Sequence, residues 1–69
     1  MIEKGTKVKW KWGNGVAYGK VKSIFEHKVE RKIKGNIITR NGTVADKAIY
    51  IEQEDGGHVL KLESEVEKT

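Results

Sequence analysis

The stretch that decides the fold runs from Val8 to Val21 and reads VKWKWGNGVAYGKV. In its first half, apolar Val8, Trp10 and Trp12 alternate with lysines. An apolar residue at every second position is typical of a β-strand with one buried and one solvated face. Gly13-Asn14-Gly15 then supplies residues that tolerate the positive φ angles of a tight turn. The stretch therefore predicts a β-hairpin.

The same period of two recurs along the chain and predicts further short strands. A second strand runs from about Val16 to His27. In an unbroken strand Val21 and Ile24 would lie on opposite faces, so we expect a bulge near Lys22-Ser23 that lets both reach the core. The other predicted elements are a strand at 29–34, a turn at Gly35-Asn36, a strand at 37–40, a loop at 42–47, a hairpin of 48–53 with 58–62, and a helical turn opened by a capping box at 64–67.

Composition narrows the class of protein. The 69 residues are expected to form a single domain, 1–69. The chain has no cysteine and no apolar run near the roughly 20 residues of a membrane span, so we expect a cytoplasmic protein without membrane contact. The chain has no proline, eight glycines and many β-branched residues, and its apolar residues alternate at every second position, which favours an all-β fold. We predict a small SH3-like (Tudor-like) barrel of about five short antiparallel strands with a short C-terminal helical turn, present as a monomer.

Charge is distributed unevenly along the chain. Residues 1–44 hold 11 Lys or Arg against three acids, a charge of +8, and residues 45–69 hold three Lys against seven acids, a charge of −4, which together give the net charge of +4. One interpretation is a face for nucleic acid or an acidic partner. The other is that the two halves pair strand to strand, so that their charges cancel.

Several short blocks, taken in order, resemble the hypervirulence-associated protein TUDOR-domain family. These blocks are Lys4-Gly5, Lys7-Val8, Trp10, Gly19-Lys20-Val21, Lys34-Gly35, Arg40-Asn41-Gly42-Thr43, Ala48-Ile49-Tyr50-Ile51-Glu52, Asp55-Gly56-Gly57 and Val59-Leu60-Lys61. They span about Lys4 to Val66. The resemblance implies a stand-alone Tudor-type barrel, mostly bacterial, with no established activity or ligand. The chain departs from the family after Asp46, where members often have a proline and Lys47-Ala48 stand here.

The aromatic residues suggest a binding site. A barrel this small has room to bury one Trp fully, so we expect Trp10 in the core and Trp12 at the rim. Trp12, Tyr18 and Tyr50 are predicted to meet at one end of the barrel. Three converging rings resemble a cage for a methylated cation, which is the weakest of the ligand hypotheses.

Basic residues favour nucleic acid as the ligand. A stripe of basic side chains would contact the phosphates while Trp12 or Tyr18 stacks on a base, and such binding would be weakly sequence-specific. The stripe comprises Lys9, Lys11, Lys20, Lys22, Arg31, Lys32, Lys34 and Arg40. The alternative is a protein-interaction adaptor that uses the rim aromatics and the acidic second half.

Catalysis has little support in the sequence. The two histidines, His27 and His58, stand 31 positions apart, and no cysteine accompanies them. Glu52, Glu54 and Asp55 lead into a glycine turn, where acids are ordinary. We therefore expect a binding module with no catalytic residue, no metal site and no cofactor.

Overall fold

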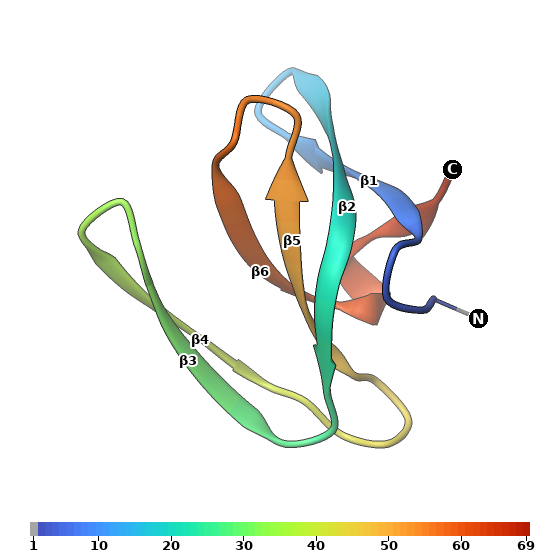
Figure 1. Cartoon of the computed structure of the whole chain (residues 1–69), viewed down its shortest axis with the longest axis vertical. Coiled ribbons are helices and arrows are strands. Elements are labelled where there is room, and N and C mark those ends of the chain that lie inside the picture. Colours follow the sequence, from blue (N-terminus) through green and yellow to red (C-terminus); the bar gives the residue numbers. More distant parts are fainter. Residues whose placement is uncertain (1) are drawn as a thin grey trace.

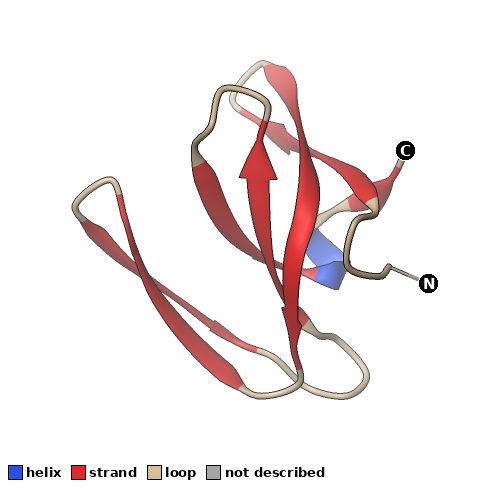
Figure 2. Ribbon diagram, in the orientation of Figure 1, coloured by secondary structure: helices blue, strands red, loops and turns tan. Residues whose placement is uncertain are grey.

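The computed structural model describes residues 2–69, and it confirms the predicted all-β class. The elements are β1 (Lys7–Trp12), β2 (Gly15–Phe25), β3 (Lys28–Ile33), β4 (Asn36–Asn41), β5 (Ala48–Gln53), β6 (His58–Leu62), the 3₁₀ turn η1 (Glu63–Glu65) and β7 (Glu67–Lys68). Figure 2 shows η1 as a single short segment between strands. Within residues 2–69, no helix has the length and apolar character that crossing a membrane requires.

The strands form two antiparallel sheets. One has the strand order β6-β5-β2-β1-β7, and the other is the hairpin of β3 with β4. In Figure 1 this hairpin leaves the end of β2, leans away from the larger sheet and returns to it at β5. The long strand β2 therefore pairs with both β1 and β5, and it leads directly into the β3–β4 hairpin.

A bulge divides β2 into two segments of opposite phase, as the sequence predicts. Val21 pairs with Ile51, but the next pair joins Ser23 to Tyr50, which leaves Lys22 as the extra residue. The inserted residue turns Ile24 toward the same core as Val21. It also turns the next residue, Phe25, toward the opposite face of the sheet.

Two apolar cores lie on the two faces of the larger sheet. The first core comprises Val8, Trp10, Val21, Ile49, Ile51 and Val66. The second comprises Val29, Ala48 and Leu60, with Phe25, Ile33, Ile38, Tyr50 and Leu62 packed against them. The second core exists because the β3–β4 hairpin covers one end of the sheet face that β5 and β6 present.

The close approach of Trp10 to β2 depends on Gly19. Trp10 is only 5% exposed, in agreement with its predicted core position. A Cβ at Gly19 would lie 3.2 Å from the Trp10 ring and 2.8 Å from the carbonyl oxygen of Glu52, and it would overlap Ile51. Only a residue without a side chain fits beneath the indole.

The turn between β3 and β4 lies one residue earlier than predicted. Ile33 pairs with Asn36, so Lys34 and Gly35 are the two turn residues. Both have positive φ angles, 50° for Lys34 and 81° for Gly35, as a tight two-residue hairpin turn requires. The glycine was the correct signal, but it occupies the second turn position rather than the first.

The C-terminal segment also differs from the prediction. Ser64 does not open the helical turn but lies inside it, where its N–H and hydroxyl donate to the carboxylate of Asp46 at 2.9 Å and 2.8 Å. Glu65 performs the capping instead, because it accepts a 2.8 Å hydrogen bond from the N–H of Leu62. The chain then forms β7, which pairs with β1 and which the sequence analysis missed.

An ion pair ties the β3–β4 hairpin to η1. The Nε of Arg40 lies 2.8 Å from a carboxylate oxygen of Glu65. Partial burial acts to raise the pKa of Glu65, but hydrogen bonds from Leu62 and Arg40, together with the charges of Arg40 and Lys61, hold the pKa below its ordinary value of 4.5. The carboxylate therefore stabilises the folded chain while it is ionised.

We expect Gly19→Ala to lower the free energy of unfolding by about 1–3 kcal/mol, because the added methyl group displaces Ile51 and Trp10. Gly15→Ala is the matched control, since a Cβ there meets no atom within 4 Å. Urea unfolding followed by tryptophan fluorescence measures both. Equal stabilities of the two variants would contradict the close packing of Trp10 on β2.

The Glu65 carboxyl predicts a dependence of stability on pH. Its lowered pKa means that the stabilisation is present above the unfolded pKa and is lost as the pH falls through the folded pKa. Glu65→Gln should lower the free energy of unfolding at neutral pH by about 1 kcal/mol or less, as for a partly exposed ion pair. The difference from wild type should close as the pH falls through the folded pKa of Glu65. Glu30→Gln, on the outer side of the hairpin, should show no such closing difference in the same urea titrations.

Candidate functional site

Lysines gather on the outer face of the β1–β2 hairpin, which is turned away from Trp10 and the first core. Residues directly opposite each other on paired strands share a face of the sheet. The pairs on the outer face are Lys7 with Lys20, Lys9 with Tyr18 and Lys11 with Val16. We refer to Lys7, Lys9, Lys11, Tyr18 and Lys20 as the lysine face.

Tyr18 is the aromatic residue of the lysine face. Tyr18 is 52% exposed. A hollow of about 480 Å³ lies beside it, with Lys7, Lys20, Gln53 and Glu54 among its lining residues. An aromatic surface is thus open to solvent between cationic side chains.

Like charges lie directly opposite each other at one position of this face. Lys7 and Lys20 are cross-strand neighbours, an arrangement that destabilises a sheet unless the charges are compensated. Glu52 stands opposite Lys20 on the other side, in β5. Its carboxylate, however, contacts Lys22 at 3.5 Å and His58 at 3.9 Å. The compensation for the Lys7–Lys20 pair is therefore incomplete.

The three aromatic rings predicted to converge do not meet, and that expectation is wrong. Trp12 is 67% exposed at the tip of β1. It shares the face of Trp10, whereas Tyr18 stands opposite Lys9 on the other face. Trp12 pairs with Gly15, and Tyr18 follows Gly15 by three residues in β2. Because successive side chains of a strand point to opposite faces, Trp12 and Tyr18 lie on opposite faces of the sheet.

Tyr50 belongs to a different aromatic group. Its ring stacks on the imidazole of His58, with centroids 5.0 Å apart and planes 6° from parallel. The guanidinium of Arg31 lies 5.8 Å from the centroid of Tyr50 and 5.2 Å from that of Phe25. This group lies where the β3–β4 hairpin meets the larger sheet, and the sequence analysis did not anticipate it.

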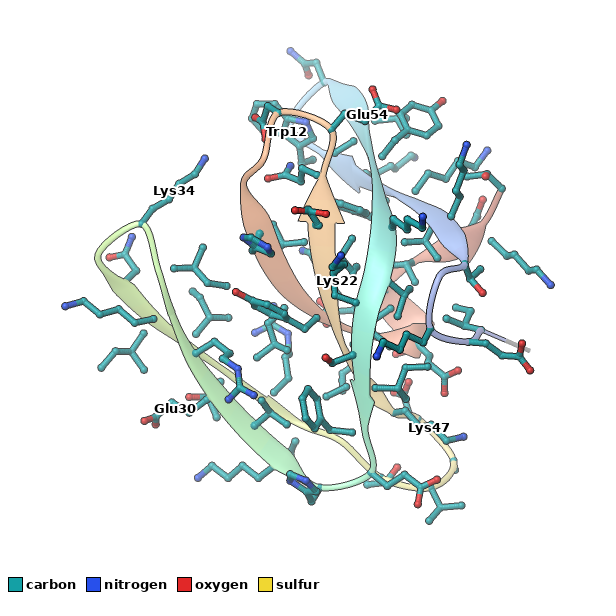
Figure 3. All side chains as sticks on the ribbon, in the orientation of Figure 1. Trp12, Lys22, Glu30, Lys34, Lys47 and Glu54 are labelled. Atoms are coloured by element: carbon teal, nitrogen blue, oxygen red, sulfur yellow. The ribbon has the colours of Figure 1, made fainter. Side chains whose placement is uncertain are left out.

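The four basic residues predicted on the second hairpin do not form one stripe. The face of Val29 turns toward the second core, and Arg31 and Arg40 share that face, Arg31 against the rings and Arg40 against Glu65. Lys32 takes the outer face by alternation. Lys34, at the hairpin tip, extends toward the β5–β6 turn, where its Cε lies 3.8 Å from a Cβ built on Gly57 (Figure 3).

The charge asymmetry of the sequence is partly neutralised within the fold. Ion pairs that join a base of residues 1–44 to an acid of residues 45–69 are Lys9 with Glu67, Lys22 with Glu52 and Arg40 with Glu65. In the described part of the chain, Lys7, Lys11 and Lys20 form no ion pair. The interpretation that the two halves pair and cancel therefore holds in part, and Lys7, Lys11 and Lys20 keep unpaired positive charge on the lysine face.

Acid and histidine side chains do not assemble into a metal site. No group of three or more potential ligands comes together among residues 2–69. His27 contacts the ring of Phe25 edge-on, and His58 stacks on Tyr50. The two histidines thus have aromatic neighbours rather than a shared ligand.

Two residues of these surfaces were absent from the predicted site. Lys7 continues the alternation of Lys9 and Lys11, so the period of two was a sufficient signal for it. His58 had no local signal, because its position beside Tyr50 depends on the register of β5 with β6.

Comparison with known proteins gives one match. Neither a search of curated proteins nor a search of solved structures finds a similar chain. Residues 5–66, which are 62 of the 69, match the model of the family described as "Hypervirulence associated proteins TUDOR domain". That family carries no catalytic assignment, and the match agrees with the all-β architecture. The chain belongs to the family of hypervirulence-associated protein TUDOR domains.

Proposed function

We propose that the protein is a non-catalytic binding module that holds nucleic acid on its lysine face with little sequence specificity. The observation that carries the proposal is the cross-strand pair of Lys7 and Lys20 beside the exposed ring of Tyr18. Packing does not require two lysines opposite each other, and their repulsion opposes sheet formation. Bound phosphates would relieve that repulsion.

The arrangement suits both parts of a nucleotide. Lysines present mobile point charges that attract phosphates irrespective of sequence. A tyrosine ring among them offers a surface on which any base can stack, since every base has a π-face. The face lacks a fixed set of side-chain amides or arginines aimed at one base edge, so weak sequence preference follows.

The adaptor hypothesis uses a different surface. Its best support is Trp12, which is exposed at the hairpin tip on the face opposite to Tyr18. A partner held by Trp12 would bind through apolar contacts that salt affects little, whereas phosphate binding weakens steeply with salt. Because the two aromatic residues lie on different faces, substitution separates the hypotheses.

We expect the affinity for a single-stranded oligonucleotide to depend strongly on salt. If the four lysines of the lysine face each contact a phosphate, the slope of log affinity against log salt is about −2.8, or about a fifty-fold loss between 50 and 200 mM. Lys20→Gln should reduce the slope to about −2.1. Fluorescence anisotropy at several salt concentrations measures both values.

Lys32→Gln is the matched control for Lys20→Gln. It removes the same charge from the outer face of the β3–β4 hairpin, so the salt slope should stay at the wild-type value. An equal reduction of the slope by both substitutions would mean that only net charge matters, and the proposed face would be wrong.

Tyr18→Ala should weaken oligonucleotide binding by about 1–3 kcal/mol, the usual loss of one base-stacking contact. Trp12→Ala should leave the affinity within about twofold, and because this side chain is exposed it should change stability by less than about 1 kcal/mol. Isothermal titration and urea unfolding of both variants test this. The reverse pattern, with binding lost only in Trp12→Ala, would favour the adaptor hypothesis.

A further inference from the structure

A second aromatic surface lies near the lysine face. Tyr50 and His58 stack with their planes 6° apart, and 34% of the His58 side chain is accessible to solvent. Tyr50 packs against the second core, so its position is fixed. His58 is thereby held as a flat, partly open ring at the outer end of the stack.

Charged side chains of both signs lie around this stack. The guanidinium of Arg31 lies over the Tyr50 ring at 5.8 Å. Lys34 reaches from the hairpin tip toward Gly57, the residue before His58. The carboxylate of Glu52 lies 3.9 Å from His58 and 3.5 Å from Lys22. As at Tyr18, an accessible ring has positive side chains nearby, here together with one carboxylate.

The pairing register places the stack on the same sheet face as Tyr18. Lys7 stands opposite Lys20, Lys20 opposite Glu52, and Glu52 opposite His58. These four residues form one row across β1, β2, β5 and β6, and residues of one row share a face. A ligand on the lysine face can therefore continue to His58 without passing an edge of the sheet.

The separation of the two rings suits a short piece of nucleic acid. From Tyr18 to His58 the path crosses from β2 through β5 to β6, two strand spacings of about 4.8 Å each, and runs two residues of about 3.3 Å each along the strand. These two perpendicular distances place the backbone positions about 12 Å apart. At the rise of about 3.4 Å per nucleotide of a stacked strand, this distance corresponds to about four nucleotides, and to fewer in an extended strand.

We propose that His58 is a second stacking position, so that the preferred ligand is a single strand long enough to contact Tyr18 and His58 together. The inference rests on the proposed function and narrows its ligand. Bases of a duplex are stacked within the helix and cannot cover either ring, whereas unpaired bases can cover both. Lys20 and Glu52 lie between the rings; Lys20 would hold a connecting phosphate, and Lys22 contacts the Glu52 carboxylate.

A length series tests the proposal. Oligothymidylates of about two, four, six and ten nucleotides are titrated into the wild-type chain by fluorescence anisotropy at low salt. Two stacking contacts on one strand act together, so affinity should rise by about tenfold or more between the dinucleotide and the hexanucleotide and level off beyond it. A duplex of equal length should bind more weakly than the hexanucleotide.

His58→Ala should remove this rise while leaving the dinucleotide affinity unchanged. His27→Ala is the matched control, because it removes the other imidazole, which lies beside Phe25 rather than Tyr50. A hexanucleotide affinity equal in the two variants would overturn the second stacking position. If a substitution unfolds the chain, proton NMR of the wild-type chain is used in place of the variant. Adding the hexanucleotide should then shift the resonances of the His58 ring protons upfield.

The outcomes separate this inference from the proposed function. Salt-dependent binding without a length dependence, or without shifts at His58, leaves the lysine face in place and overturns the second position. Absence of binding by every oligonucleotide at low salt overturns both.

Discussion

The bulge between Val21 and Ser23 in β2 is the constraint on which the rest of the structure depends. β2 pairs with β1 along its first half and with β5 along its second half, so its side-chain phase determines both cores. The extra residue, Lys22, lets Val21 and Ile24 enter the first core and directs Phe25 into the second. Without it, Ile24 and Phe25 would exchange faces, because a shift of one residue reverses every side chain in a strand.

The lysine face follows from the same strand. Gly19 and Val21 point inward, with Trp10 covering Gly19, so Tyr18 and Lys20 must point outward. Packing explains why these two positions are exposed to solvent. It does not explain why they hold a tyrosine and a lysine, since any polar residue could be exposed there. The opposition of Lys7 to Lys20 lowers the stability of the pairing rather than raising it. A residue choice that opposes folding, on a face open to solvent, is better explained by a ligand than by structure.

Sequence alone predicts what is encoded locally. The alternation around Trp10 predicts β1, the phase conflict of Val21 with Ile24 predicts the bulge, and the glycines mark the turns. The errors concern contacts between distant segments. The inward position of Arg31 depends on how the β3–β4 hairpin folds over the sheet, and the two residues of β7 are too short to carry a pattern of their own. Register across strands, which separates Trp12 from Tyr18, has no signal within either strand.

Acids of the second half of the chain border the lysine face, and Glu52 and Glu54 also line the hollow beside Tyr18. Glu67 contacts Lys9 at one side and Glu52 contacts Lys22 at the other. Exposed pairs of this kind contribute about 0–1 kcal/mol each to stability, so the fold does not depend on them. Their larger effect is on the electrostatic field: Glu67 repels phosphates at the β7 border, and the Glu52 carboxylate, which Lys22 and His58 share, lowers the positive potential along the row from Lys20 to His58. The positive charge is therefore concentrated on β1 and β2, where the proposed single strand would be held by its phosphates, and the strand would reach His58 by base stacking.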